Sequence, residues 1–161
     1  MKRQPRIEAV AAKRPYRILI SWSDGGHDLV DVGGLVRSLR GLAPLRDREM
    51  FKKVRVKEWG WAIEWTHSGG ELDIGAETLW RLALEQKGEA MSAEQFREWR
   101  ARHKLSHDQA ARALGLSRRT VIYYDQGQRP IPKTVWLATI GIDARRRRRS
   151  KVADGALREW S

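Results

Sequence analysis

The residues with the clearest chemistry in this sequence are basic, and they gather toward its C-terminal end. Residues 91–161 hold 16 Lys and Arg against 7 Asp and Glu, a net charge of +9, whereas residues 1–90 hold 16 against 13, a net charge of +3. Guanidinium and ammonium groups at this density attract a polyanion, which is either a nucleic acid or an anionic membrane surface. Charge alone does not separate these two partners.

The strongest local charge is a run of consecutive arginines: Arg145, Arg146, Arg147, Arg148 and Arg149. As a helix this run would repel itself, whereas as an arm it can lie along phosphates or enter a narrow minor groove. The alternatives are a solubilising tail or a patch that attracts RNA or a membrane. We expect an arm that lies along phosphates, because the run closely follows the helical segments of residues 92–127. After it, Val152 to Trp160 is expected to form a tail or a short helix, with Leu157 and Trp160 available for packing.

The carboxylates of the first half do not form a catalytic pattern. None has a recognisable acid/base partner, and His27 and His67 are isolated. The sequence contains no phosphate-binding glycine loop, no nucleophile motif and no histidine cluster at metal-ligand spacing. We therefore expect no enzyme activity, no metal and no cofactor. The carboxylates considered are Asp24, Asp31, Asp47, Glu64, Glu71 and Asp73.

The cellular compartment is indicated by two features. The chain has no cysteine, which excludes disulfides and thiolate metal sites and fits a reducing compartment. The N-terminus is basic, but no apolar segment follows it, and the longest apolar runs are far shorter than a membrane span. We expect a cytoplasmic protein without a membrane partner.

The first half is predicted to be a small antiparallel sheet with one or two helices. Arg17 to Trp22 is rich in strand-favouring residues, and a glycine-containing turn, Asp24-Gly25-Gly26, follows at once. Other strands are expected at Ile7 to Ala11, His27 to Val32, Val54 to Lys57, Ala62 to Trp65 and Leu72 to Ile74. Helical segments are expected at Leu35 to Leu39, ended by Gly41 and Pro44, at Glu49 to Lys52 and at Glu77 to Gln86.

A change of composition marks a domain boundary. Lys87-Gly88-Glu89-Ala90 is polar and contains glycine, and the periodicity after it is helical. The fold class is therefore α+β. We expect a small α+β domain at residues 1–86, a linker at 87–91, an all-α domain at 92–149 and the tail at 150–161.

Three short helices in the second domain are delimited by their caps. Ser92, Ser106 and Ser117 each precede a helical segment, and Gln109 completes a capping box with Ser106. Glycines follow the second and third helices, at the position where a left-handed conformation is cheapest. These glycines are Gly115 and Gly127. Phe96 and Trp99 are expected on one side of the first helix, and Val121 and Tyr124 are expected to face inward from the third. The second helix contains Ala110, Ala111, Ala113 and Leu114, whose small alanines suit a close contact between helices.

The segment from Leu105 to Val121, with Tyr124-Asp125-Gln126-Gly127 after it, resembles the lambda-repressor-like (Cro/C1, xenobiotic-response-element type) helix-turn-helix. This likeness covers about a third of the chain. Tyr124 and Asp125 replace the more usual Trp and Glu, and His107 stands where Gln is common. The second helix of such a motif enters the major groove of DNA.

The resemblance implies roles for the matching residues. Arg118, Arg119 and Tyr123 take the positions that read base edges, where Arg donates two hydrogen bonds to guanine and Tyr packs on a thymine methyl group or reaches a phosphate. Arg100 and Asp125 match an internal ion pair. The residues implied to contact the DNA backbone are Ser106, His107, Ser117, Thr120, Gln128, Arg129 and Lys133.

The segment from Tyr16 to Leu82 resembles the small bacterial "domain of unknown function 2442". The residues that carry the resemblance are Ile20-Ser21-Trp22-Ser23-Asp24-Gly25, Val30-Asp31-Val32, Leu45-Arg46-Asp47, Phe51, Gly60-Trp61-Ala62-Ile63-Glu64-Trp65 and Glu71-Leu72-Asp73-Ile74. Members of this family occur with antitoxin-type regulators, which implies a protein partner. Trp59, Trp61 and Trp65 are expected mostly in the core or on a hairpin face, with some exposed for that partner.

The function expected from these features is a sequence-specific DNA-binding transcriptional regulator, a repressor that binds an inverted repeat as a homodimer. The alternative is an antitoxin or adaptor. Its N-terminal domain would bind a partner protein while the helix-turn-helix represses its own operon. An RNA-binding protein is a third hypothesis.

Overall fold

The chain folds as two compact units, Met1–Lys87 and Gly88–Ser161. The computed structural model describes residues 4–159, and each unit is described by itself. The first contains antiparallel sheets and short helices, and the second is mainly helical, which confirms the α+β class. Gly88 has a positive φ of 72° close to the boundary, which suits glycine.

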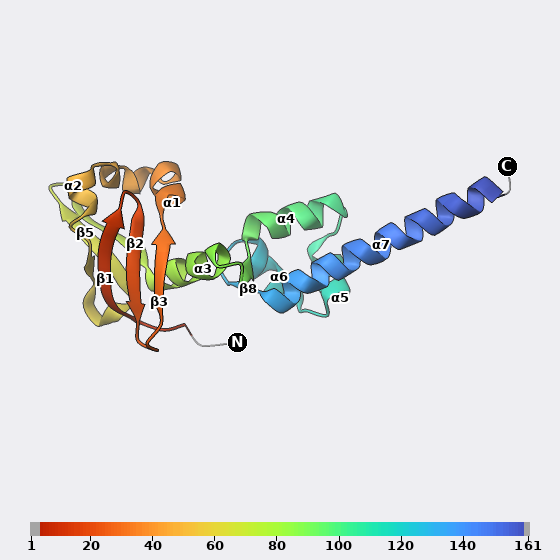
Figure 1. Cartoon of the computed structure of the whole chain (residues 1–161), viewed down its shortest axis with the longest axis horizontal. Coiled ribbons are helices and arrows are strands. Elements are labelled where there is room, and N and C mark those ends of the chain that lie inside the picture. The colour runs from red at the N-terminus through yellow and green to blue at the C-terminus, as the bar shows by residue number, and fades with distance from the viewer. Residues whose placement is uncertain (1–3, 160–161) are drawn as a thin grey trace. The chain divides into compact units, whose positions relative to one another are not determined.

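The first sheet is an antiparallel meander in the order β1-β2-β3, formed by β1 (Ile7–Arg14), β2 (Arg17–Trp22) and β3 (His27–Asp31). Figure 1 shows the three strands side by side. Ile18, Ile20 and Trp22 of β2 are buried, as expected where alternate residues of a strand face the core. The strands predicted here are confirmed, although β1 extends beyond its predicted end.

A segment of short helices follows β3. It comprises α1 (Gly33–Ser38), the 3₁₀ helix η1 (Arg40–Arg46) and α2 (Arg48–Phe51), whose N-cap Asp47 accepts hydrogen bonds from two backbone N–H groups. The helix expected at Leu35 to Leu39 ends at Ser38, before Gly41 and Pro44, but these two residues lie inside η1 rather than in irregular chain. A 3₁₀ turn tolerates them here, and the burial of Leu42 and Leu45 fixes this segment on the core.

The second sheet has the order β4-β5-β6 and contains β4 (Arg55–Val56), β5 (Ala62–His67) and β6 (Gly70–Gly75). The 3₁₀ turn η2 (Glu58–Gly60) joins β4 to β5. Gly60 has φ 72°, and a Cβ atom there would collide with the carbonyl oxygen of Ile7. The absence of a side chain at Gly60 therefore allows η2 to lie against β1.

Helix α3 (Ala76–Gln86) packs on β3 and β6. Leu79 and Ala83 are buried, whereas Trp80 and Leu82 are only partly buried. At the end of α3, the Gln86 side chain accepts a hydrogen bond from the N–H of Asp31 and donates one to its carbonyl oxygen. The Gln86 amide thus pairs with β3 as a neighbouring strand would.

The second unit begins with a two-stranded pairing of β7 (Ala90–Met91) with β8 (Ile131–Pro132). The linker expected at 87–91 and the all-α character of 92–149 therefore need correction. Met91 and Ile131 are 5% and 1% exposed. Strands of two residues are too short for sequence periodicity to reveal, and the pairing forms only when the helices bring the segments together.

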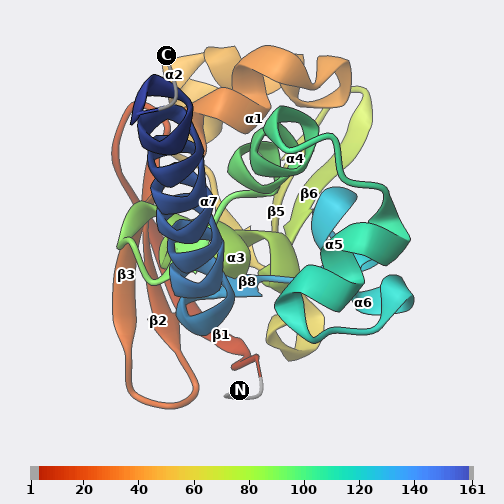
Figure 2. The ribbon, with the colours of Figure 1, turned by 90° about the vertical axis from the view of Figure 1, so that its right-hand side faces the viewer.

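Three short helices pack around the second core: α4 (Ala93–Arg102), α5 (His107–Leu114) and α6 (Arg118–Asp125). Ser92 and Ser106 form capping boxes with Gln95 and Gln109, as the spacing of Ser106 and Gln109 predicted. Phe96, Trp99, Val121 and Tyr124 are buried as expected. In α5, Ala110 and Ala111 are buried, whereas Leu114 is partly buried and Ala113 is exposed. Figure 2 shows α5 and α6 next to each other.

The last element is one helix, α7 (Lys133–Glu159), which extends past the rest of its unit in Figure 1. Arg145 to Arg149 are helical, so the expectation of a non-helical arm and of a separate element at 150–161 is corrected. Arg is a good helix former, and each like-charge pair one turn apart costs only about 0.2–0.5 kcal/mol. Leu157 and Val152 are each 72% exposed, and Trp160 lies outside the described residues.

Candidate nucleic-acid interface

The connection between α5 and α6 is short and conformationally fixed. Gly115 takes the left-handed conformation, with φ 67° and ψ 34°, and the N–H of Leu116 donates to the carbonyl of Ala111 over 2.9 Å. Ser117 begins α6, and its Oγ accepts from the N–H of Thr120 over 3.1 Å. The turn therefore sets where the first residues of α6 lie.

The outer side of α6 carries the residues expected to read bases. Arg118 and Arg119 are exposed and Tyr123 is half-buried. On the inner side, Val121 is fully buried and Tyr124 is 6% exposed, packing edge-on against Phe96. Burial raises the pKa of Tyr124. The inner residues anchor α6, which leaves Arg118 and Arg119 on its exposed side.

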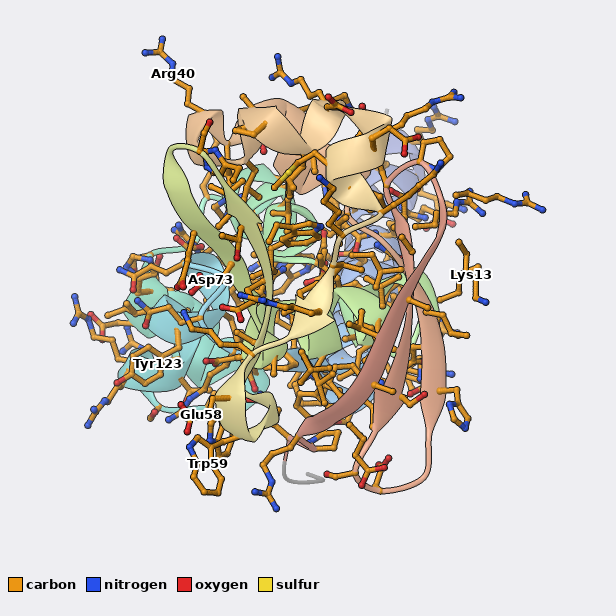
Figure 3. All side chains as sticks on the ribbon, turned by 90° about the vertical axis from the view of Figure 1, so that its left-hand side faces the viewer. Lys13, Arg40, Glu58, Trp59, Asp73 and Tyr123 are labelled. Carbon is orange, nitrogen blue, oxygen red and sulfur yellow. The ribbon has the colours of Figure 1, made fainter. Side chains whose placement is uncertain are left out.

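Tyr123 connects two arginines. Arg119 Nε donates to the Tyr123 hydroxyl over 2.6 Å, and its guanidinium lies 5.3 Å from the ring centre. The guanidinium of Arg129 lies 4.5 Å from the centre of the same ring, within the range of a cation–π interaction. Figure 3 shows Tyr123 on the outside of its unit. The three side chains form a continuous cationic and aromatic surface.

The hydroxyl groups expected to contact the DNA backbone also have structural roles. Ser106 and Ser117 cap their helices, and the hydroxyls of Ser117 and Thr120 are 2.8 Å apart. A capping Oγ accepts from the backbone, so its O–H can still donate to a phosphate, although one of the Ser117 and Thr120 hydroxyls already donates to the other. Gln128 and Lys133 are exposed, and the Gln128 N–H donates to the carbonyl of Tyr123 over 2.9 Å.

Arg100, His107 and Asp125 form an ionic cluster beneath α6. Arg100 donates from Nε and Nη2 to the two carboxylate oxygens of Asp125 over 3.0 and 3.1 Å, and His107 Nε2 lies 3.3 Å from Oδ2. Burial raises the pKa of Asp125, but the hydrogen bonds and charges of Arg100 and His107 outweigh burial and hold it below the ordinary value. The cluster ties α4 and α5 to the end of α6. It also engages one ring nitrogen of His107 with Asp125.

A second cluster, around Asp143, anchors α7 and was not found by sequence reasoning. Asp143 accepts from Trp99 Nε1 and Arg102 Nη2 over 3.1 and 3.0 Å, and its Oδ1 is in close contact with His103 Nε2. Burial raises the pKa of Asp143, but His103, Arg102 and Trp99 together lower it below the ordinary value. Asp143 follows its three partners by 40 to 44 positions in the sequence, so no local spacing predicted the cluster.

The arginine run begins immediately after this anchor. Arg146 Nη1 donates to His103 Nδ1 over 2.9 Å, so one arginine of the run is tied to α4. All five arginines are exposed. Residues at i, i+3 and i+4 share one side of a helix, which places Arg145, Arg148 and Arg149 together and Arg147 on another side. The run is therefore a cationic helix with distinguishable sides.

Arg112 is a further cation that the sequence analysis missed. Together with Asp108 and Arg118, it lines a hollow of about 400 Å³ between α5 and α6. Arg118 Nε lies 3.5 Å from Asp108 Oδ1, in an exposed ion pair. Arg112 follows Asp108 by one helical turn, a spacing that identifies neighbours on one side of α5.

The described residues contain neither a candidate metal site nor a candidate membrane-spanning helix. Within residues 4–159, no three His, Asp or Glu side chains gather in an arrangement that could hold a metal ion. None of the described helices combines the length and apolar character needed to cross a membrane.

Comparison with known proteins identifies the family of the chain. Residues 7–85 match the family described as "Protein of unknown function (DUF2442)", which confirms the resemblance of the N-terminal segment. The chain also resembles the crystal structure of "Putative DNA Binding Protein NE0471" from Nitrosomonas europaea ATCC 19718. The TM-score is 0.53 and the sequence identity 40%, over 91% of this chain and 92% of that one. The chain belongs to the same family as this protein. No curated protein matches it.

Proposed function

We propose that α5 and α6 form a helix-turn-helix of the lambda-repressor-like type, and that α6 enters the major groove of duplex DNA. The observation that carries this proposal is the outer side of α6. Arg118, Arg119 and Tyr123 are presented there by a helix that is capped at its start and anchored by buried residues. The 40%-identical relative whose name describes DNA binding supports it.

Within this proposal, contacts divide into two kinds. Arg118 and Arg119 donate to guanine edges, and Tyr123 lies between Arg119 and Arg129 so that it meets a thymine methyl group or a phosphate. The surrounding residues Ser106, Ser117, Thr120, Gln128 and Lys133 position the duplex through its phosphates. Arg100 and Asp125 support α6 from the side away from DNA. No residue is assigned a catalytic role.

The cationic helix at Arg145–Arg149 is proposed to follow the DNA backbone. Its exposed guanidinium groups would neutralise phosphates and release counterions, which adds affinity without sequence preference. Because the run is helical, only the arginines on one side can meet a single phosphate track. This differs from an extended arm, in which every arginine could do so.

The biological role that follows is a transcriptional regulator that represses by occupying an inverted repeat as a homodimer. An antitoxin or adaptor role is the second candidate, and one observation favours it. Trp59 and Trp61 are 72% and 56% exposed, and Trp59 holds a left-handed conformation with φ 65° that is costly for a bulky residue. Exposed tryptophans on a fixed turn are suited to capture a protein partner.

Selection of bound sequences from random duplex DNA tests the proposal with the full chain. We expect a defined sequence motif, and a symmetric one if the protein binds as a homodimer. Absence of any enriched sequence would overturn the base-reading role. Tighter binding to structured RNA than to the selected duplex at equal salt concentration would favour the RNA-binding hypothesis.

A further inference from the structure

The charges of the N-terminal unit are strongly segregated. The turn residues Lys13 and Arg14, together with residues 37–53, hold eight Lys and Arg against two Asp and Glu, a net charge of +6. We call this set the basic end. The rest of residues 4–87 holds six against ten, a net charge of −4. A unit with little overall charge therefore has a local field that attracts anions to one end.

The cations outside the basic end are mostly paired. Each of these five side chains lies within ion-pair distance of a carboxylate: Arg17, Arg55, Lys57, Arg81 and Lys87. At the basic end, by contrast, Lys13, Arg14 and Arg48 have no hydrogen-bond or ion-pair partner for their side chains among the described residues. Figure 3 shows Lys13 projecting away from the ribbon. These three cations are available to an external anion.

The three unpaired cations line the same hollow. It has a volume of about 170 Å³ and lies between the β1–β2 turn and α2. Lys52 also lines it but is paired with Glu49 at 2.8 Å. The remaining lining residues are apolar: Ala12, Pro15 and Phe51. The hollow therefore combines three cationic groups with an apolar wall and has no carboxylate in its lining.

The base of this hollow is formed by a closely packed aromatic residue, Phe51. Phe51 is 3% exposed and packs edge-on against Tyr16, with ring centres 5.8 Å apart. Its ring also lies 6.0 Å from that of Trp65, whose Nε1 donates to the Phe51 carbonyl over 2.9 Å. Tyr16 lies in the β1–β2 turn with a φ of 64°, so the aromatic contact joins this turn to α2.

We propose that this hollow binds a phosphate monoester that carries an apolar or aromatic group. A terminal phosphate presents three oxygens to three cations, whereas a carboxylate presents two, and Arg binds phosphate through paired N–H groups. The apolar part of the ligand rests on Ala12 and Pro15, while the buried Phe51 supports the hollow from beneath. The same chemistry has two sources, a small phosphorylated molecule and the 5′-phosphate end of a nucleic acid. The site lies on the N-terminal unit and does not depend on the DNA-binding role proposed for α6.

Calorimetric titration of the full chain with phenyl phosphate, at about 150 mM salt to suppress diffuse charge effects, tests this inference. We expect saturable binding with one ligand per chain and weaker binding of inorganic phosphate, which lacks the apolar group. The Arg14→Gln/Arg48→Gln variant is expected to weaken phenyl phosphate binding by about tenfold or more. The matched control is Arg40→Gln/Lys53→Gln, which removes two exposed cations of the basic end that do not line the hollow, and it should bind as the wild type does.

The outcomes separate the alternatives. Absence of binding to phenyl phosphate and inorganic phosphate up to about 10 mM would overturn the proposal, and so would an equal loss in both variants, because that result indicates diffuse charge. The dinucleotide of thymidine, with and without a 5′-phosphate, distinguishes the two sources of the ligand, and it is too short to fill a DNA groove.

A preference for the phosphorylated dinucleotide over phenyl phosphate identifies nucleic-acid ends as the source, and the reverse preference identifies a small molecule. Thermal unfolding of both variants verifies that they remain folded.

Discussion

Arg119 donates a hydrogen bond from Nε to the hydroxyl of Tyr123, one turn further along α6, over 2.6 Å. The Tyr123 ring is also in contact with the guanidinium of Arg129. A guanidinium held by a neighbour loses less side-chain freedom when it binds than one that moves freely. In the proposed complex, Tyr123 therefore acts on affinity both through its own contact and through the orientation of the two arginines.

Replacing either recognition arginine is expected to relax sequence choice. Arg118→Ala and Arg119→Ala should each weaken binding to the selected site by about 1–3 kcal/mol. Binding to random DNA should weaken much less, because the lost contacts are to base edges. Competition titrations at fixed salt measure both affinities. Arg97→Ala is the control for loss of a basic side chain, because this arginine donates to the Asp125 carbonyl and is not one of the proposed base-reading residues. It should not relax sequence choice. Equal losses on selected and random DNA would assign Arg118 and Arg119 to the phosphates instead.

Removing the Tyr123 hydroxyl is expected to have a smaller effect. Tyr123→Phe keeps the ring beside Arg129 but deletes the acceptor for Arg119, so binding to the selected site should weaken by about 0.5–1.5 kcal/mol. In the Arg119→Ala background the same change should have little further effect, because its partner is already absent. Additive losses in this double-mutant cycle would mean that Tyr123 and Arg119 act independently.

The salt dependence of DNA binding distinguishes a cationic helix from an unwound arm. Each lost phosphate contact lowers the slope of log K against log salt by about 0.9. The triple variant Arg145→Gln/Arg148→Gln/Arg149→Gln, whose sites share one side of α7, should lower the slope by roughly 2–3. Arg147→Gln is the matched control on another side of the helix and should change the slope little. A contribution from Arg147 equal to the average of the other three would indicate that the run unwinds on DNA.

The ion pair of Arg100 with Asp125 should make the second unit sensitive to acid. Because the pKa of Asp125 in the folded protein is lowered from its ordinary value of 3.8, the stabilisation is present above about pH 3.8 and is lost as the pH falls through the lowered folded pKa. Asp125→Asn should reduce the free energy of unfolding by about 1.5–3 kcal/mol at pH 5. The difference from wild type should shrink toward pH 2, as measured by chemical denaturation. A difference that stays constant over this range would exclude the linkage.

Gly60 is expected to be indispensable for the N-terminal unit. Gly60→Ala combines a positive φ of 72° with a collision between the new Cβ and the Ile7 carbonyl, so it should destabilise the unit by more than the roughly 1 kcal/mol of the conformational effect alone. Gly34→Ala is the control, since its Cβ would meet open space and its φ is not positive. Thermal unfolding of both variants measures the effect. Equal melting temperatures would contradict the close approach of η2 to β1.

The sequence by itself determined the elements that depend on local chemistry. Gly115 and the serine caps delimit α5 and α6, because a left-handed glycine and a capping hydroxyl act within one turn of the chain. Strand-favouring residues likewise located β2, and turns that contain glycine located the ends of several strands. These local signals therefore predicted the α+β class, the apolar side of α4 and the inner side of α6.

The tertiary structure decided the features that require distant segments to meet. The two-residue strands β7 and β8 pair across 40 residues, and Asp143 gathers Trp99, Arg102 and His103 from another helix. Neither leaves a local pattern. The arginine run is helical rather than extended because α7 continues from an anchored start, and exposed like charges in water oppose a helix only weakly. The hollow at Arg14 and Arg48 likewise exists only because the β1–β2 turn and α2 pack on each other, which brings together cations that are 34 positions apart.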